Sequence, residues 1–360
     1  MKPYNEDYNV ATLFFLVSGE NPTLPTSEVK SILESEKILY ETLDSLPQIF
    51  RIEANPKCIE IIQRRASMTR VGGVEFFKCK AEMKEIEKYF EKFDITLYLD
   101  EGESFAVRVK RVRGSSIEIK RKELEKNLGN KVLNKIKRTK VNLKNPQKTF
   151  LCLLSGGCLL FGLKKFEIKA KEFIKRGGEG KVFTHPAEMT PKLARCMVNL
   201  TQAKTGDIVL DPFCGTGSFL LEASLVGCRV LGFDVLRSMI RGSSRNLAFF
   251  GVNPEGLIVA DIRSPPLRCR MVDCIVTDPP YGTSATTLGV GRREVFKKFL
   301  SVVAKLVKNG GRICFAAPKT VDAKEIGERL GFKYVESHFI YIHRSLTREI
   351  VVFQLARGMV

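Results

Sequence analysis

Four consecutive residues, Asp278-Pro279-Pro280-Tyr281, have the chemistry to bind and activate the amino group of a nucleic-acid base. Each proline fixes its own backbone and lacks an N–H donor, so the pair predicts a rigid extended turn with outward-facing carbonyl oxygens. The Asp278 carboxylate and the Pro279 carbonyl then offer two acceptors for the two hydrogens of an exocyclic amino group. A simple Pro-Pro turn after a buried strand explains the prolines but not the flanking aspartate and tyrosine.

These residues suit a poor nucleophile such as guanine N2, whose lone pair is delocalised into the ring. Accepting both hydrogens returns electron density to the nitrogen, and Asp278 can later take the released proton. Tyr281 adds an aromatic face on which an extruded base can stack. The segment therefore predicts group transfer to an amino nitrogen.

A glycine-containing loop, Asp211-Pro212-Phe213-Cys214-Gly215-Thr216-Gly217-Ser218, supplies the second candidate site. It follows a predicted strand and opens a predicted helix, which is where open α/β sheets bind ligands. Its glycine spacing is too short for a dinucleotide fingerprint, and no Gly-Lys-Ser/Thr of a P-loop follows. Asp211 would repel a pyrophosphate, so the loop favours a cationic cofactor that carries an amino acid.

Two further aspartates follow the next two predicted strands. Asp234 comes 23 residues after Asp211, where an acidic side chain can accept hydrogen bonds from both ribose hydroxyls of an adenosine. Asp261 can accept a hydrogen bond from the adenine amine. One such aspartate is usually a helix cap or a solvated turn, but three in succession beside a glycine loop predict an adenosyl pocket.

The elements that must position these residues alternate between strand and helix from residue 184 onward. The predicted strands are 208–210, 229–233, 256–259, 273–277 and 312–317, and the predicted helices are 217–227, 236–251 and 294–308. This alternation predicts a doubly wound, mainly parallel sheet. Two long apolar runs, 334–343 and 349–356, predict an antiparallel hairpin at its edge.

The N-terminal half has a different pattern. Residues 1–60 read as a small α+β unit, with a strand at 10–17, a helix at 27–35 capped by Thr26 or Ser27, and short strands within 40–54. Residues 61–163 form a basic block. Its predicted helices are 59–68, 82–93 and 120–138, the last broken near Gly129, and its predicted strands are 104–112, 149–154 and 159–163. Residues 164–183 are rich in lysine and glycine and predict a linker to the domain at 184–360.

The charge is unevenly distributed. The net charge is +19, and residues 61–180 hold 29 Lys and Arg against 15 Asp and Glu, whereas residues 1–60 hold 5 against 10. A basic middle suggests a polyanionic partner, although a solvated lysine-rich surface would give the same imbalance.

Other classes of site find little support. No Cys-x-x-Cys pair occurs among the ten cysteines, so we expect reduced thiols and no metal. The apolar runs are too short to span a bilayer and the N-terminus lacks a signal-peptide pattern, so a cytoplasmic protein without a membrane partner is expected. The oligomeric state is not determined, and a monomer is compatible with the sequence.

These segments together resemble a known family. Asp278-Pro279-Pro280-Tyr281 is similar to the signature of amino-group methyltransferases acting on DNA and RNA bases. The run 105–111, followed by Asn145-Pro146 and Gly156-Gly157, resembles a THUMP domain, an RNA-binding module, and segments 18–20 and 24–29 resemble the ferredoxin-like region that precedes it. Segments 185–189 and 343–348 resemble the archaeal tRNA guanine-10 N2-methyltransferases.

The resemblance implies an α/β fold: a C-terminal Rossmann-like methyltransferase domain preceded by ferredoxin-like and THUMP domains. It implies transfer of one or two methyl groups from S-adenosylmethionine to guanosine 10 of tRNA. The implied cofactor-binding residues are Thr184, His185, Pro186, Asp211, Pro212, Cys214, Gly215, Gly217, Ser218, Asp234, Asp261, Ile262 and Asp278. The residues expected to contact tRNA phosphates are Arg111, Arg113, Lys120, Lys131 and Lys135.

The sequence leaves three alternatives open and speaks against a fourth. A related THUMP enzyme for guanosine 6 of tRNA would be expected to carry Asn at position 278. A DNA adenine methyltransferase is disfavoured by the THUMP-like block. A non-catalytic tRNA-binding factor is disfavoured by the intact Asp211 and Asp278, and a radical enzyme by the missing cysteine triad.

Overall fold

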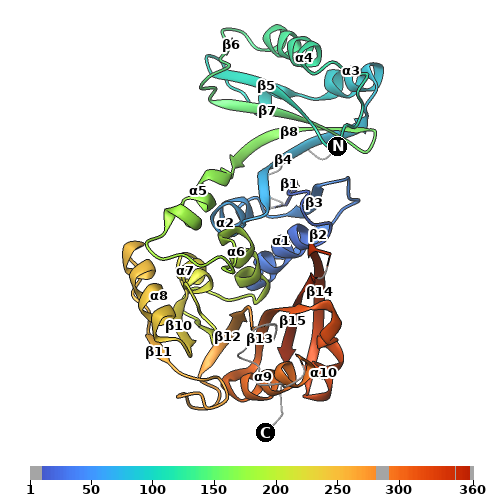
Figure 1. Cartoon of the computed structure of the whole chain (residues 1–360). Coiled ribbons are helices and arrows are strands. Elements are labelled where there is room, and N and C mark those ends of the chain that lie inside the picture. The colour runs from blue at the N-terminus through green and yellow to red at the C-terminus, as the bar shows by residue number, and fades with distance from the viewer. Residues whose placement is uncertain (1–9, 281–291, 345, 357–360) are drawn as a thin grey trace. The chain divides into compact units, whose positions relative to one another are not determined.

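A computed structural model describes residues 10–280, 292–344 and 346–356 (Figure 1). The chain forms two compact units, and each is discontinuous in sequence. The smaller unit contains Met1–Pro22, Ile38–Gln63 and Thr69–Ile168, and the larger contains Thr23–Lys37, Arg64–Met68 and Lys169–Val360.

The smaller unit is built on an eight-stranded sheet of order β2-β3-β1-β4-β8-β7-β5-β6. The strands are β1 (Ala11–Val17), β2 (Tyr40–Thr42), β3 (Ile49–Ala54), β4 (Thr69–Lys80), β5 (Ser104–Arg111), β6 (Lys140–Val141), β7 (Lys148–Ser155) and β8 (Cys158–Glu167). Its helices are α2 (Cys58–Arg65), α3 (Met83–Lys92) and α4 (Arg121–Lys135). Strand β5 runs parallel to β6 and β7, and the other pairs are antiparallel.

One prediction for this unit was wrong. Helix α4 runs through Gly129 without a break. A glycine costs a helix about 1 kcal/mol relative to alanine, and here the neighbouring Leu128 and Val132 are fully buried. Their packing offsets that cost, so the helix continues to Lys135.

The larger unit contains the predicted doubly wound sheet, with strand order β11-β10-β9-β12-β13-β15-β14. The strands are β9 (Ile208–Asp211), β10 (Arg229–Asp234), β11 (Gly256–Val259), β12 (Val272–Thr277), β13 (Val307–Pro318), β14 (Phe332–His343) and β15 (Leu346–Leu355). The first five pair in parallel. Strands β14 and β15 form the predicted antiparallel hairpin at the edge of the sheet.

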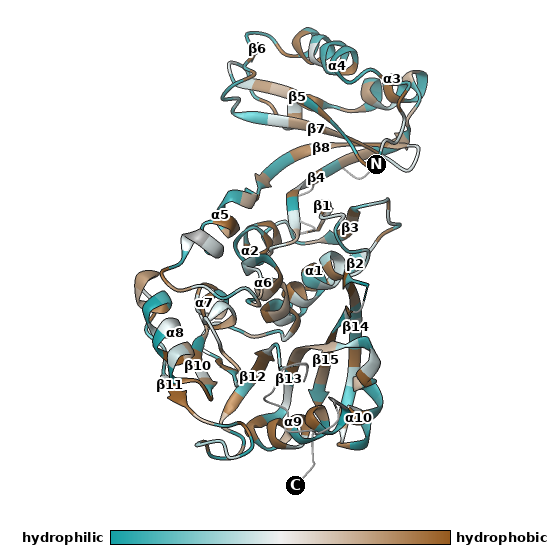
Figure 2. Cartoon of the chain, in the orientation of Figure 1, coloured by the Kyte–Doolittle hydropathy of each residue, from teal (hydrophilic) through white to brown (hydrophobic). Residues whose placement is uncertain are grey.

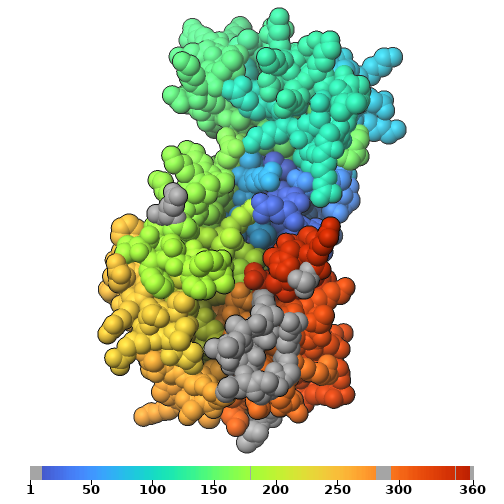
Figure 3. Space-filling view, in the orientation of Figure 1, coloured from blue at the N-terminus to red at the C-terminus, as the bar shows by residue number. Residues whose placement is uncertain are grey.

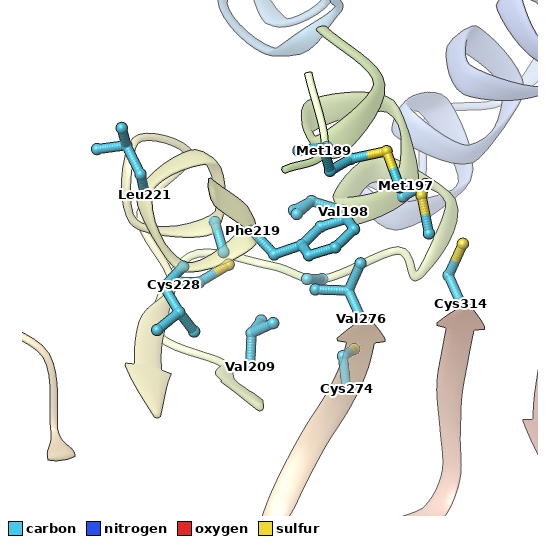
Figure 4. Close-up of a cluster of buried hydrophobic side chains, with 14 of the residues drawn as sticks. Met189, Met197, Val198, Val209, Phe219, Leu221, Cys228, Cys274, Val276 and Cys314 are labelled. Carbon is cyan, nitrogen blue, oxygen red and sulfur yellow. The ribbon is translucent and has the colours of Figure 1, made fainter. Parts of the chain in front are cut away.

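Helices cover both faces of this sheet, and apolar residues run along its strands (Figure 2). Helices α1 (Leu24–Ser35), α6 (Pro191–Leu200) and α7 (Ser218–Ser224) pack on one face, where α8 (Arg237–Phe249) also contributes. Helices α9 (Arg292–Leu306) and α10 (Ala323–Arg329) pack on the other. In Figure 4, Cys274 and Val276 of β12 lie below Phe219, with Met197 and Val198 close by.

Helix α1 differs from its prediction. It begins at Leu24 after Thr23 and has a proline in its first turn, so Thr26 and Ser27 lie inside the helix and do not cap it. Ser27 Oγ instead donates a hydrogen bond to Glu336 Oε2 on β14 (2.6 Å). A local capping pattern could not reveal this, because the partner lies more than 300 residues away.

The fully buried Glu28 shows how α1 is held in the larger unit. Its carboxylate accepts hydrogen bonds from Ser67 N (2.9 Å), Ser67 Oγ (2.6 Å), Met68 N (2.7 Å) and Asn199 Nδ2 (2.9 Å). Burial raises the pKa of Glu28, while these four donors act in the opposite direction. The network ties α1, segment 64–68 and α6 into one core.

Candidate active site

The parallel strands bring the predicted site residues to one edge of the sheet. Asp211 and Asp234 end the neighbouring strands β9 and β10, and Asp278 directly follows β12 on the other side of β9. The carboxyl ends of parallel strands share an edge. Residues separated by up to 67 positions in sequence therefore meet around the loop that follows Asp211.

Asp211 is the most buried acid of this edge, with 1% of its surface exposed. Its Oδ1 accepts hydrogen bonds from Thr277 Oγ1 (2.6 Å) and Phe213 N (3.1 Å). Its Oδ2 is buried and has no hydrogen-bond partner among the described residues. Burial raises the pKa of Asp211 to about 7, and the nearby charges of Asp234 and Asp278 add to the shift. A buried acceptor of this kind suits a cationic donor on a ligand.

The loop after Asp211 needs glycine at two positions. Gly215 and Gly217 have φ of 49° and 84°, in the left-handed region. A Cβ on Gly217 would lie 2.5 Å from Ser243 Oγ of α8. Asp234 supports the loop from the next strand, since its Oδ2 accepts a hydrogen bond from Gly215 N (3.0 Å).

Hydrogen bonds and an ion pair hold residues 181–189 against this loop. Lys181 Nζ donates to Ser218 Oγ (2.7 Å) and forms an ion pair with Glu188 Oε2 (3.1 Å), although only 1% of the lysine side chain is exposed. Thr216 Oγ1 also donates to Glu188 Oε2 (2.9 Å). Asn246 of α8 completes the attachment by donating to the carbonyl oxygens of Phe183 and Thr216 (2.8 and 2.9 Å).

These elements line a pocket at this edge of the sheet. Six predicted residues line it: His185, Asp211, Cys214, Gly215, Ser218 and Asp278. Seven predicted cofactor residues are not among its lining residues: Thr184, Pro186, Pro212, Gly217, Asp234, Asp261 and Ile262. The other lining residues are Ala187, Glu188 and Met189 of segment 185–189, Phe213 and Thr216 of the glycine loop, and Phe219 and Met239, which the sequence did not single out.

Asp261 and Cys214, two predicted cofactor-binding residues, differ in their surroundings. Asp261 is engaged by Arg263, whose Nε lies 2.9 Å and Nη2 2.5 Å from Oδ2, and this contact lowers the pKa of Asp261. Cys214 lines the pocket, but burial raises the pKa of its thiol far above neutrality. A thiol that stays protonated is a poor nucleophile, so the geometry does not favour covalent catalysis by Cys214.

Asp278 lies between the pocket and the hairpin. Its Oδ2 is 3.4 Å from Arg348 Nη2, and both side chains are more than four-fifths buried. Arg348 belongs to β15, opposite Pro318 of β13, and its Nη1 also contacts Met189 Sδ at 3.7 Å. Arg348 was not among the predicted site residues, although the segment containing it carried the family resemblance. Tyr281 lies outside the described residues.

Two family models match the sequence. One, described as RMKL-like, methyltransferase domain, matches residues 179–348, and the THUMP domain model matches residues 80–161. A relative from Methanothermobacter thermautotrophicus, named tRNA (guanine(10)-N2)-dimethyltransferase, is 34% identical over 343 residues, which cover 95% of this chain and 99% of the relative. This chain belongs to that family.

Further similarities fit the tRNA (guanine(10)-N2)-dimethyltransferase family. A Methanocaldococcus jannaschii protein of the same name is 28% identical and is aligned over 94% of this chain and 99% of its own length. Among solved structures, TrmN from Thermus thermophilus has a TM-score of 0.55 at 18% identity, with coverage of 96% of this chain and 99% of that chain. That structure shares the fold.

Four of the five candidate tRNA-binding residues of this family member contact other residues in the described part of the chain. Arg111 Nη2 donates to the carbonyl oxygens of Ser116 (3.0 Å) and Ile119 (2.5 Å). Lys135 Nζ donates to three carbonyl oxygens, Lys131 pairs with Glu91 (2.6 Å) and Lys120 with Glu123 (3.1 Å). Arg113 is exposed and has φ of 47°. Exposed pairs are worth about 0–1 kcal/mol, so they do not prevent binding to phosphate.

Within the described ranges, no cluster of three or more His, Cys, Asp or Glu side chains is arranged to hold a metal ion. No helix in the described part of the chain is long and apolar enough to cross a membrane. The cysteines are free thiols, and Cys269 is exposed.

Proposed function

We propose that this chain transfers one or two methyl groups from S-adenosylmethionine to the exocyclic N2 of guanosine 10 in tRNA. The two relatives described above carry the name tRNA (guanine(10)-N2)-dimethyltransferase. The observation that carries the proposal is the position of Asp278, which lines the same pocket as Asp211 and the glycine loop. An acceptor for the target amino group thus lies beside a pocket for the methyl donor.

The pocket suits the proposed cofactor. Asp211 offers a cationic amino group a buried Oδ2 that has no hydrogen-bond partner within the described part of the chain. His185, Gly215 and Ser218 line the same space. When bound, S-adenosylmethionine supplies an electrophilic methyl group on a sulfonium. Asp234 lies one strand further along the edge, beside Gly215, where it is suited to ribose hydroxyls.

Asp278 and the Pro279 carbonyl accept the two hydrogens of guanine N2, which raises the electron density on that nitrogen. Arg348 lies 3.4 Å from Asp278 Oδ2. A cation at that distance favours the ionised carboxylate, which is the form that accepts a hydrogen bond and then a proton. Tyr281 follows in sequence and is proposed to stack on the target base.

The other half of the chain is proposed to bind the tRNA backbone. The THUMP match covers residues 80–161, within the region of strongest positive charge. We propose four functional regions: a ferredoxin-like region (1–60), a THUMP domain (61–163), a linker (164–183) and a methyltransferase domain (184–360). Because the substrate is tRNA, we assign the protein to the cytoplasm.

The experiment is a methylation assay with labelled S-adenosylmethionine and two tRNA transcripts that differ only at position 10, G or A. We expect label in the G10 transcript alone, and digestion with mass spectrometry should give N2-methylguanosine or N2,N2-dimethylguanosine at that position. Methylation at position 6, or equal methylation of both transcripts, would contradict the proposal. Cofactor binding without turnover would favour the non-catalytic tRNA-binding factor.

A further inference from the structure

Aromatic and basic side chains are exposed at the end of the β14–β15 hairpin. Phe339 and Tyr341 on β14 are 49% and 69% exposed, and Ile342 beside them is 43% exposed. Lys319, the residue after β13, places its Nζ 5.4 Å from the centroid of the Phe339 ring. With the exposed Arg344, these residues form what we call the hairpin surface, on the part of the chain shown in red in Figure 3.

Successive residues of β14 point to opposite faces of the sheet, which separates the hairpin surface from the core. His338 is buried and its Nδ1 lies 2.7 Å from Thr23 Oγ1, and Ile340 packs against the core on the same face. Phe339 and Tyr341 therefore point to the opposite face, as successive strand residues do. The inner face of this part of β14 is therefore packed, and the two partly exposed aromatic rings lie on the other face.

The strand register places this surface at the edge that carries Asp278. Arg348 lies opposite Pro318 at the end of β13 and opposite Ile340 on β14, and its guanidinium reaches Asp278. The strands lie in the order β12-β13-β15-β14. Three spacings of about 4.8 Å put β14 roughly 14 Å from β12, a distance that a few nucleotides can span.

The chemistry of the surface matches unstacked RNA. A base that is methylated must leave its stack, and its neighbours then lose a stacking partner. Exposed aromatic rings replace that partner, and a cation next to the ring binds phosphate. Glu349, the acid in register with Phe339, is 7% exposed, so its carboxylate is largely covered.

We propose that the hairpin surface binds the nucleotides that flank the target guanosine, with bases stacked on Phe339 and Tyr341 and a phosphate near Lys319 or Arg344. The inference rests on the proposed function, because it assumes an RNA target at Asp278. It assigns the β14–β15 hairpin to substrate positioning, whereas the basic N-terminal half binds the tRNA backbone.

The test compares the affinity of the full chain for an unmodified G10 tRNA transcript in Phe339→Ala, Tyr341→Ala and the double variant. We expect each single change to weaken binding about tenfold, while Tyr341→Phe, which keeps the ring, binds as the wild type does. Phe249→Ala is the matched control, because Phe249 is 62% exposed at the end of α8 that is remote from the pocket. Affinity for the cofactor analogue sinefungin must be unchanged in every variant, which confirms that the fold is intact.

Wild-type affinity in the double variant would overturn the proposal. The double variant could also keep its affinity for tRNA but change its oligomeric state in sedimentation. That result would show that the two rings contact a second copy of the chain instead of RNA. If the wild type methylates a nucleotide other than G10 while the alanine variants still lose affinity, the proposed function fails and the hairpin surface stands. If G10 is methylated and the alanine variants bind tRNA as the wild type does, the proposed function stands and the proposal for the hairpin surface fails.

Discussion

At the scale of single residues, Asp278 and Arg348 connect the pocket to the hairpin. Asp278 follows β12, Arg348 lies on β15, and their side chains approach to 3.4 Å. Residue types alone predicted a functional role for Asp278, because a carboxylate next to two prolines can accept the hydrogens of an amino group. Arg348 carries no such signal in the sequence, since its role comes from the strand register that brings it to the carboxyl edge.

Replacing Asp278 by Asn removes the charge and keeps the shape. The amide offers a weaker acceptor and no base for the released proton, so we expect the rate at saturating tRNA and cofactor to fall by about 10²–10³. Dissociation constants for tRNA and S-adenosylmethionine should stay within about twofold. Single-turnover methylation measures the rate, and a variant that keeps wild-type turnover would show that the target site lies elsewhere.

Arg348→Met should lower the same rate and move the acid limb of the pH–rate profile to higher pH. The reason is that loss of a nearby cation makes the Asp278 carboxylate easier to protonate. Arg348→Lys keeps the charge and should restore the wild-type acid limb in part. Arg329→Met, at an exposed position on α10, is the control with an unchanged profile. A lower rate with no shift of the limb would indicate a purely structural role.

Asp211 gives a prediction about stability and pH. Its folded-state pKa is raised by burial to about 7, from the usual 3.8. The contribution of Asp211 to the free energy of unfolding is therefore fully present below about pH 4 and is lost as the pH rises through 7. We expect Asp211→Asn to gain Tm relative to the wild type between pH 5 and pH 8 in the absence of cofactor. The same change should weaken cofactor binding, and a Tm difference that is independent of pH would contradict the assignment.

At the scale of elements, strand ends were predictable and contacts between elements were not. The β9–β13 strands and the edge hairpin follow from apolar periodicity and turn residues, which are local signals. The lysine and glycine residues of segment 164–183 predict a linker, which includes the first residues of segment 181–189. Its fixed position depends on Lys181, Glu188 and Asn246, whose partners lie up to 63 residues away. Sequence patterning does not record such pairs.

Two glycines with similar φ allow the effect of backbone strain to be separated from the effect of side-chain crowding. Gly217 and Gly206 have similar φ, 84° and 88°, but a Cβ would be 2.5 Å from Ser243 Oγ at Gly217 and would meet nothing within 4 Å at Gly206. Both alanine variants should lose about 1–2 kcal/mol from backbone strain. Only Gly217→Ala should also force Ser243 Oγ to move, and we expect it to weaken cofactor binding more than Gly206→Ala does. Chemical denaturation measures the loss of stability, and calorimetry measures cofactor affinity. Equal cofactor affinity in both variants would contradict the expected effect of crowding.

At the scale of the whole molecule, the basic half of the chain predicts salt-sensitive tRNA binding. The logarithm of the affinity should fall linearly with the logarithm of salt concentration. Arg113→Ala should lower the steepness of that line by about one unit if Arg113 binds one phosphate. Arg111 is a poorer test, because it also holds the carbonyls of Ser116 and Ile119. Arg329→Ala should leave the slope unchanged, and a flat salt dependence in the wild type would exclude this mode of binding.

The discontinuous larger unit has a consequence for biosynthesis. Helix α1 emerges from the ribosome early, but Thr23 bonds to a residue 315 positions later, and Glu28 to one 171 positions later. Until those partners are translated, the buried apolar face of α1 (Leu24, Val29, Ile32 and Leu33) has no core to join. The nascent chain must keep this helix from aggregating while the intervening residues fold around it. The methyltransferase region of this family member is thus completed only near the end of translation, and it cannot be transplanted as a single contiguous stretch of gene.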